Sequence, residues 1–170
     1  LEKINSIFKS FDINYDLINL DVSKFENEIE NLNERGEKVS TNQMSNMANI
    51  NKSLLEAKKS EDLIYFVEDD YLHQKHAISE MVFTYERLAS QINKDLILCP
   101  TDYPYLYAKA DITQNFLGHN YHWRKVNETL CTFLTSKNII EKYWDQYIGM
   151  CKKEHAPFEK PLHTIYEKEL

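Results

Sequence analysis

The segment Leu63-Ile64-Tyr65-Phe66-Val67-Glu68-Asp69-Asp70-Tyr71 sets a run of apolar residues directly before three consecutive carboxylates. The run Leu63–Val67 has the length of a strand, and its apolar residues are continuous rather than alternating. That pattern is typical of a strand covered on both faces in a parallel sheet. Open α/β sheets bind ligands at the carboxyl ends of their strands. The segment therefore predicts a buried strand with a binding site at its end.

Strand and helix patterns alternate along the rest of the chain. The predicted strands are Tyr15–Val22, Leu63–Val67, Leu96–Cys99 and Leu130–Thr135. The predicted helices lie around Phe25–Leu32, after the capping-box pair Ser40 and Gln43, over Ile78–Ile92, over Ile139–Ile148 after a Ser136 cap, and between Pro157 and Leu170. Residues 100–128 are predicted to be irregular. This order predicts one α/β domain over residues 1–170, with a mostly parallel sheet flanked by helices.

Composition excludes several classes of protein. The 170 residues carry a net charge of −7, which argues against a nucleic-acid partner because such proteins normally present a basic face. No apolar stretch approaches the roughly 20 residues of a transmembrane helix. The three cysteines are far apart in the sequence, which favours reduced thiols and a cytoplasmic protein. With only three glycines, the chain has no glycine-rich phosphate loop.

The three adjacent carboxylates are the strongest candidate for a binding site. Their mutual repulsion is relieved by a cation, and hard oxygen ligands suit Mg²⁺ or Mn²⁺. We therefore predict that Glu68 and Asp70 bind the metal. The alternative is that Asp69 or Asp70 caps the helix predicted to begin near Gln74.

Two further acids follow predicted strands. Asp102 comes after Leu96–Cys99, so it should lie on the same sheet edge as the acidic triplet, although Asp beside Pro is also ordinary turn chemistry. Asp21 ends Tyr15–Val22 and could accept hydrogen bonds from a ribose or a base. Alternatively, Asp21 caps the helix that begins at Lys24.

Several segments together resemble a known family. Leu63–Tyr71 resembles the strand and metal motif of GT-A-type, family 2-like bacterial glycosyltransferases, in which Asp-x-Asp or Glu-Asp-Asp ends a buried strand. Asn46–Asn51 resembles the helix before that strand, and Leu98–Pro104 and His122–Thr135 are similar to segments of a bacterial subgroup. The resemblance covers about Tyr15–Leu170. It implies that the chain starts after the first strand of the fold.

The resemblance implies a metal-dependent enzyme that transfers a sugar from a nucleotide-diphosphate sugar to an acceptor hydroxyl. The acceptor would be a carbohydrate or a lipid-linked molecule, so this cytoplasmic protein could work at the membrane surface. Asp70 and Glu68 would hold Mn²⁺ or Mg²⁺, which stabilises charge on the departing nucleoside diphosphate. Asp21, Glu68 and Asp69 would contribute to nucleotide binding.

The catalytic base has two candidates. Glu159 lies in about the place of the family's late acidic motif, and Asp102 is its rival. The alternative for Glu159 is a favourable place at a helix N-terminus. Arg124 could bind the diphosphate through two parallel hydrogen bonds, or it could be an ordinary solvated charge.

Two other functions fit the same residues. A different metal-dependent phosphoryl enzyme, such as a nucleotidyltransferase or a nuclease, would also use an acidic cluster, but a nuclease should have a basic groove. The third possibility is a non-catalytic, truncated α/β domain that serves protein interaction.

Overall fold

The structure is a computed structural model that describes residues 7–10, 14–25, 27–101, 113–127, 129 and 131–168. Its helices are η1 (Val22–Lys24), α2 (Thr41–Ala57), α3 (Ala77–Ile92), α4 (Lys137–Lys142), α5 (Trp144–Lys152), η3 (Lys160–Leu162) and α6 (His163–Tyr166). Its strands are β1 (Leu63–Phe66), β2 (Ile97–Leu98), β3 (Asn115–Leu117), β4 (His122–Arg124) and β5 (Phe133–Ser136). Within the described ranges, no helix is long and apolar enough to cross a membrane.

The central sheet corrects the predicted fold class. Its strand order is β1-β5-β2, and β5 runs antiparallel to both neighbours. The second sheet is the antiparallel hairpin β3–β4. The sheets are therefore short and antiparallel, so the prediction of a mostly parallel, GT-A-like sheet is wrong. The reason is that a continuous apolar run marks a strand buried on both faces but does not encode its direction.

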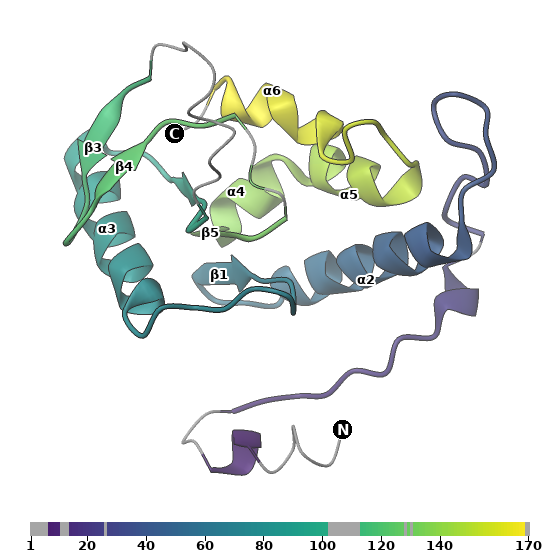
Figure 1. The fold of residues 1–170 in the computed structure, drawn as a ribbon, viewed down its shortest axis with the longest axis horizontal. Helices are drawn as coiled ribbons and strands as arrows, with labels where there is room; N and C mark the ends of the chain where they lie inside the picture. The colour runs from purple at the N-terminus through teal and green to yellow at the C-terminus, as the bar shows by residue number, and fades with distance from the viewer. Residues whose placement is uncertain are drawn as a thin grey trace.

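The most buried strand, β5, lies at the centre of the main sheet. All four residues of β5 are buried, whereas all four of β1 are only partly buried. Side chains alternate between the two faces along each strand. Phe133 packs with α2, α4, α5 and α6 on one face, and Leu134 packs with α3 on the other. Figure 1 shows β1 and β5 between these helices.

Two serines fix helix starts as the sequence predicts. The Oγ of Ser40 accepts a hydrogen bond from the backbone N–H of Gln43 at 3.1 Å, which begins α2. The Oγ of Ser136 accepts one from the N–H of Ile139 at 3.2 Å, which begins α4 directly after β5. Each cap satisfies an N–H group that has no partner inside its helix. These local predictions are confirmed.

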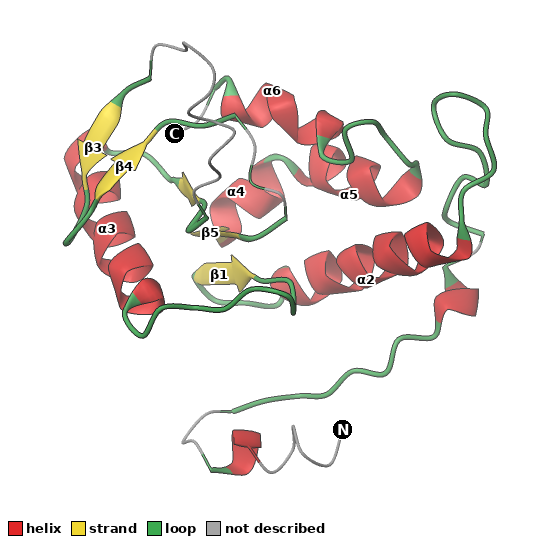
Figure 2. Cartoon of the chain, viewed as in Figure 1, coloured by secondary structure: helices red, strands yellow, loops and turns green. Residues whose placement is uncertain are grey.

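Other predicted elements differ from the structure. The predicted strand Tyr15–Val22 is not formed: residues 15–21 have no regular structure, and Figure 2 draws them as a loop that runs apart from the sheets. Val22 begins η1. The segment around Phe25–Leu32 makes turns and an isolated bridge between Leu32 and Lys38 instead of a helix. The predicted helix Ile139–Ile148 is interrupted at Tyr143, where the backbone leaves helical geometry. The hairpin β3–β4 lies inside the stretch predicted to be irregular.

Candidate functional site

The three carboxylates that follow β1, Glu68, Asp69 and Asp70, are called the acidic tip. All three side chains are exposed where the chain leaves the sheet. The backbone N–H of Glu68 donates a hydrogen bond of 3.4 Å to Thr132 Oγ1, just before β5. Because β5 is antiparallel to both β1 and β2, these two outer strands run in the same direction. The tip and the end of β2 therefore share one edge of the sheet.

The acidic tip carries unfavourable electrostatics. Partial burial and the negative charges of Asp70 and Asp69 raise the pKa of Glu68 above its ordinary value. Like charges so close disfavour full ionisation, and a proton or a cation relieves the repulsion. The tip is thus poised to bind positive charge.

A groove of about 1070 Å³, called the α2 groove, extends from the acidic tip along α2. One wall carries Gln43, Asn46 and Asn49, whose amide groups both donate and accept hydrogen bonds. The other lining residues are mostly apolar and include Ile18, Leu20, Ile50, Ile64, Phe66, Phe133, Met150 and Phe158. The groove therefore combines an acidic end, an amide wall and an apolar floor.

Tyr147 lines the same groove from α5. Its side chain is only 1% exposed, and among the described residues its hydroxyl has no hydrogen-bond partner. Burial, followed by the charge of Glu159, raises the pKa of Tyr147. A buried hydroxyl normally finds a partner, so this one offers a hydrogen bond to a molecule in the groove.

Glu159, predicted as a catalytic base, lies in the wall behind the groove. It is 3% exposed and accepts hydrogen bonds from Thr129 N–H at 3.2 Å and from Tyr166 Oη at 3.0 Å. Burial, together with the charges of Glu159 and Glu68, raises the pKa of Cys131 to about 12. Cys131 thus lies near both carboxylates and remains a thiol at neutral pH. Glu159 is not among the residues that line the α2 groove, and its role as a base stays a prediction.

Asp21 and Arg124 do not join the acidic tip. Asp21 precedes η1 and accepts a hydrogen bond from Ser23 Oγ at 2.6 Å. It lines neither the α2 groove nor the second cavity, which is described below. That hydrogen bond lowers its pKa. Arg124 lies on β4 and lines a different cavity, so the two predicted diphosphate-binding groups, Arg124 and the tip, are not brought together. Asp102 lies outside the described residues.

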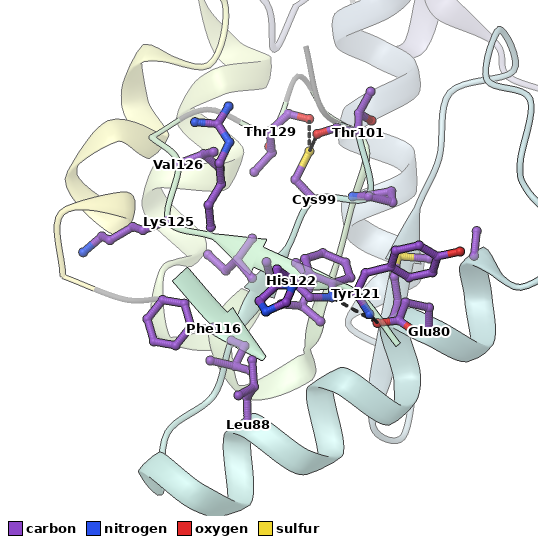
Figure 3. Close-up of a pocket in the computed structure, with 18 of the residues that line it drawn as sticks. Glu80, Leu88, Cys99, Thr101, Phe116, Tyr121, His122, Lys125, Val126 and Thr129 are labelled. Atoms are coloured by element: carbon purple, nitrogen blue, oxygen red, sulfur yellow. Dashed lines mark hydrogen bonds between the residues drawn. The ribbon is translucent and has the colours of Figure 1, made fainter. Parts of the chain in front are cut away.

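The second cavity, called the hairpin cavity, has a volume of about 490 Å³. It lies between α3, β2 and the hairpin β3–β4. Figure 3 shows Leu88 and Phe116 at one end and Cys99, Thr101 and Thr129 at the other. Arg124 is the one lining residue among the predicted site residues, and the hairpin that forms this cavity lies in a stretch predicted to be irregular.

The hairpin is fixed to α3 by Glu80, which is 5% exposed. Its carboxylate accepts hydrogen bonds from backbone N–H groups of His119, Asn120 and Tyr121, at 2.9 to 3.2 Å. Thr84 Oγ1, Asn120 Nδ2 and Trp123 Nε1 donate three more. Burial alone would raise the pKa of Glu80, but the hydrogen bonds outweigh it and the pKa lies below its ordinary value. The only sequence signal for this role is an acid beside the apolar stripe of α3.

Within the described part of the chain, no three His, Cys, Asp or Glu side chains are grouped to hold a metal ion by themselves. The acidic tip still fits a site that its ligand completes, because Mg²⁺ commonly binds one or two carboxylates together with substrate phosphates and waters. Comparison of the chain with protein-family models, curated proteins and solved structures finds no match to any of them.

Proposed function

We propose that this chain is a divalent-metal-dependent transferase that takes a sugar from a nucleotide-diphosphate sugar. The observation that carries the proposal is the acidic tip opening into the α2 groove, which is large enough for such a donor. The resemblance of Leu63–Tyr71 to the metal motif of nucleotide-sugar transferases supports the same reading.

Each part of the groove suits one part of the donor. The amides of Asn46 and Asn49 lie one helical turn apart on the same side of α2 and could pair with the edge of a base. The apolar floor, with Phe66 and Phe133, would cover the faces of the nucleoside. The buried Tyr147 hydroxyl would donate a hydrogen bond to an oxygen of the ligand.

The acidic tip would hold Mg²⁺ or Mn²⁺ through Asp70 and Glu68, with the diphosphate and water as further ligands. When bound, the ion supplies positive charge that stabilises the departing nucleoside diphosphate. Burial and the charges of Asp70 and Asp69 raise the pKa of Glu68, and the charge of the ion would offset this repulsion.

The transfer itself requires balanced bond changes. The oxygen of the acceptor hydroxyl forms a bond to the anomeric carbon of the sugar. The bond from that carbon to the diphosphate oxygen breaks, and its electron pair leaves with the nucleoside diphosphate. The hydroxyl proton passes to a base or to water. Glu159 already accepts hydrogen bonds from Thr129 and Tyr166 and does not line the α2 groove.

Thermal unfolding tests the donor site. We expect Mn²⁺ and UDP or GDP together to raise the midpoint, because a ligand that binds only the folded state adds about 2.7 kcal/mol at a hundredfold excess over its Kd. Asp70→Asn should abolish the shift. Asp62→Asn is the matched control, because Asp62 is an exposed acid at the opposite end of β1. A shift that survives in Asp70→Asn would refute the metal role of the tip.

Turnover separates transfer from other phosphoryl chemistry. The chain with Mn²⁺ and a UDP- or GDP-sugar should release the nucleoside diphosphate and a sugar product. Release of a nucleoside monophosphate would instead indicate cleavage within the diphosphate. If no nucleoside diphosphate produces a thermal shift, the transferase proposal is wrong and the non-catalytic alternative stands.

A further inference from the structure

We propose that the hairpin cavity is a second binding site, which takes an anionic amphiphile with a single alkyl chain. The cavity has an apolar floor for the chain and a basic rim for the headgroup. Its volume of about 490 Å³ is within the range of small-molecule sites. The proposal goes beyond the transfer and does not depend on the metal or on the nucleotide.

The floor consists of side chains from the core beneath the hairpin. Leu88, Leu96 and Leu98 form it from α3 and the region of β2, and Phe116 and Trp123 close it from the hairpin. The cavity wall is thus built on buried core residues that are 2% to 8% exposed. Burying an alkyl chain there would remove its apolar surface from water, which is favourable.

The rim is basic although the protein as a whole is acidic. His122, Arg124 and Lys125 follow one another on and after β4, and all three line the cavity. Figure 3 shows His122 and Lys125 on the hairpin side of the cavity. Among the described lining residues the one acid is Glu80, and its two oxygens already accept hydrogen bonds from the hairpin. The described residues of the rim thus bring more basic than acidic side chains to the cavity.

The hydroxyl of Thr101, at the end of the cavity opposite Leu88 and Phe116, adds a hydrogen-bond donor for the headgroup. The Thr101 hydroxyl oxygen is buried and, among the described residues, has no hydrogen-bond partner. Thr101 lines the cavity, and Figure 3 places it beside Cys99 and Thr129. A buried hydroxyl of this kind is rarely left without a partner, and an anionic oxygen would accept its hydrogen.

The way the hairpin is attached explains why this space exists. The strands β3 and β4 pair only with each other and form a sheet separate from β1-β5-β2. Glu80 and Arg87, whose Nη1 donates to the Gly118 carbonyl at 2.9 Å, fix the turn end of the hairpin to α3. The remainder of the hairpin faces the sheet across the cavity. A ligand can therefore enter without breaking a backbone ladder.

The probe is octyl phosphate, followed by tryptophan fluorescence. The chain has two tryptophans, of which Trp123 lines the cavity and Trp144 contacts Lys58 on the opposite side of the sheet. In a Trp144→Phe background, we expect octyl phosphate to produce a saturable change in Trp123 emission with no metal present. Octyl glucoside and inorganic phosphate should each bind at least tenfold more weakly. Equal binding of octyl glucoside would overturn the anionic headgroup, and equal binding of inorganic phosphate would overturn the alkyl site.

Charge-reversal and truncation variants locate the site. Lys125→Glu should raise the Kd for octyl phosphate at least tenfold. Lys38→Glu, an exposed lysine that lines neither cavity, makes the same change in net charge and should leave the Kd unchanged. Phe116→Ala should weaken octyl phosphate binding severalfold, and far-ultraviolet circular dichroism would establish that each variant is folded.

Two further outcomes contradict the proposal, and a third measurement separates it from the proposed sugar-donor site. If Lys125→Glu and Phe116→Ala both bind as the parent does, the ligand lies elsewhere. If octyl phosphate produces no saturable change, the cavity does not bind this class of molecule. Asp70→Asn should leave octyl phosphate binding intact, because the acidic tip belongs to the other groove. The transfer proposal can therefore fail while this one holds, and the reverse is equally possible.

Discussion

Glu80 and the acidic tip show two opposite ways in which this chain places carboxylates. Glu80 is buried, and N–H and O–H donors surround its oxygens, so its pKa is lowered. Glu68 is exposed beside Asp69 and Asp70, and its pKa is raised. The first acid stabilises the fold when ionised, whereas the second opposes its own ionisation. Burial alone therefore does not mark a functional acid. What distinguishes the two is whether protein donors already satisfy the charge.

The largest expected effect comes from removing the satisfied acid. Glu80→Ala leaves the backbone N–H groups of His119, Asn120 and Tyr121 without their acceptor. We expect a loss of about 3 kcal/mol in the free energy of unfolding, measured by urea denaturation. Glu86→Ala, an exposed acid on the same helix, is the control and should change stability by less than about 0.5 kcal/mol. Equal stabilities for the two variants would show that the hairpin does not depend on Glu80.

The second-largest expected effect comes from Gly118, where the hairpin backbone lies close to Thr84 of α3 and to the Trp123 ring. A Cβ at Gly118 would collide with the Trp123 ring and lie 2.7 Å from Thr84 Oγ1. We expect Gly118→Ala to destabilise the protein by about 2 kcal/mol. Gly149→Ala is the matched control, because no atom lies within 4 Å of a Cβ there. Unchanged stability for Gly118→Ala would mean that the hairpin can shift away from α3 at little cost.

The pH dependence of stability should reveal Glu80 directly. Its pKa in the folded state lies below the ordinary value of 4.5. The stability that it contributes is therefore present above about pH 4.5 and lost as the pH falls through the lower folded-state pKa. As the pH falls below about 4.5, Glu80→Gln should lose less stability than the parent. Parallel curves of unfolding free energy against pH would contradict the lowered pKa.

The smallest expected effect concerns Glu68 of the acidic tip, whose ionisation lowers the stability of the fold instead of raising it. Because the pKa of Glu68 is raised, the ionised form is disfavoured in the folded state, and the protein gains stability as the pH falls through that pKa. Glu68→Gln should therefore be neutral or stabilising at pH 7, by at most a few tenths of a kcal/mol because the group is exposed. A clear destabilisation would show that Glu68 is held by contacts of the kind found at Glu80.

Helix caps and the position of a strand were predictable from the sequence. The direction of each strand in the sheet and the strand it pairs with were not. The caps at Ser40 and Ser136 follow from residue type and spacing, and both are confirmed. The apolar run before Glu68 does form a strand. Its pairing with β5 instead of a parallel neighbour depends on contacts far along the chain, which no local pattern contains.

For the candidate site, the sequence likewise indicated a local cluster of residues but not the groove around it. The acidic tip was found because three carboxylates stand together in the sequence. The α2 groove beside it arises from α2, α5 and residues near Phe158, which only the folded chain brings together. Arg124 was assigned to the same ligand as the tip because basic residues suit phosphate, but the hairpin carries it to the other cavity. The role of Glu80 depends on backbone N–H groups, which every sequence has and no sequence pattern marks.

The central position of β5 has a consequence for how the chain acquires its structure. Both β1 and β2 form their ladders with β5, which is the last of the described strands along the chain. The backbone hydrogen bonds of α2 and α3 are local to each helix, whereas β1 and β2 need Phe133–Ser136, which come later in the chain, to form their ladders. Such long-range pairing slows folding, because the intervening chain must be ordered first. A chain that lacks residues 133–136 would therefore expose the unpaired edge of β1, and a nascent chain that has not yet reached them would pass through an aggregation-prone stage.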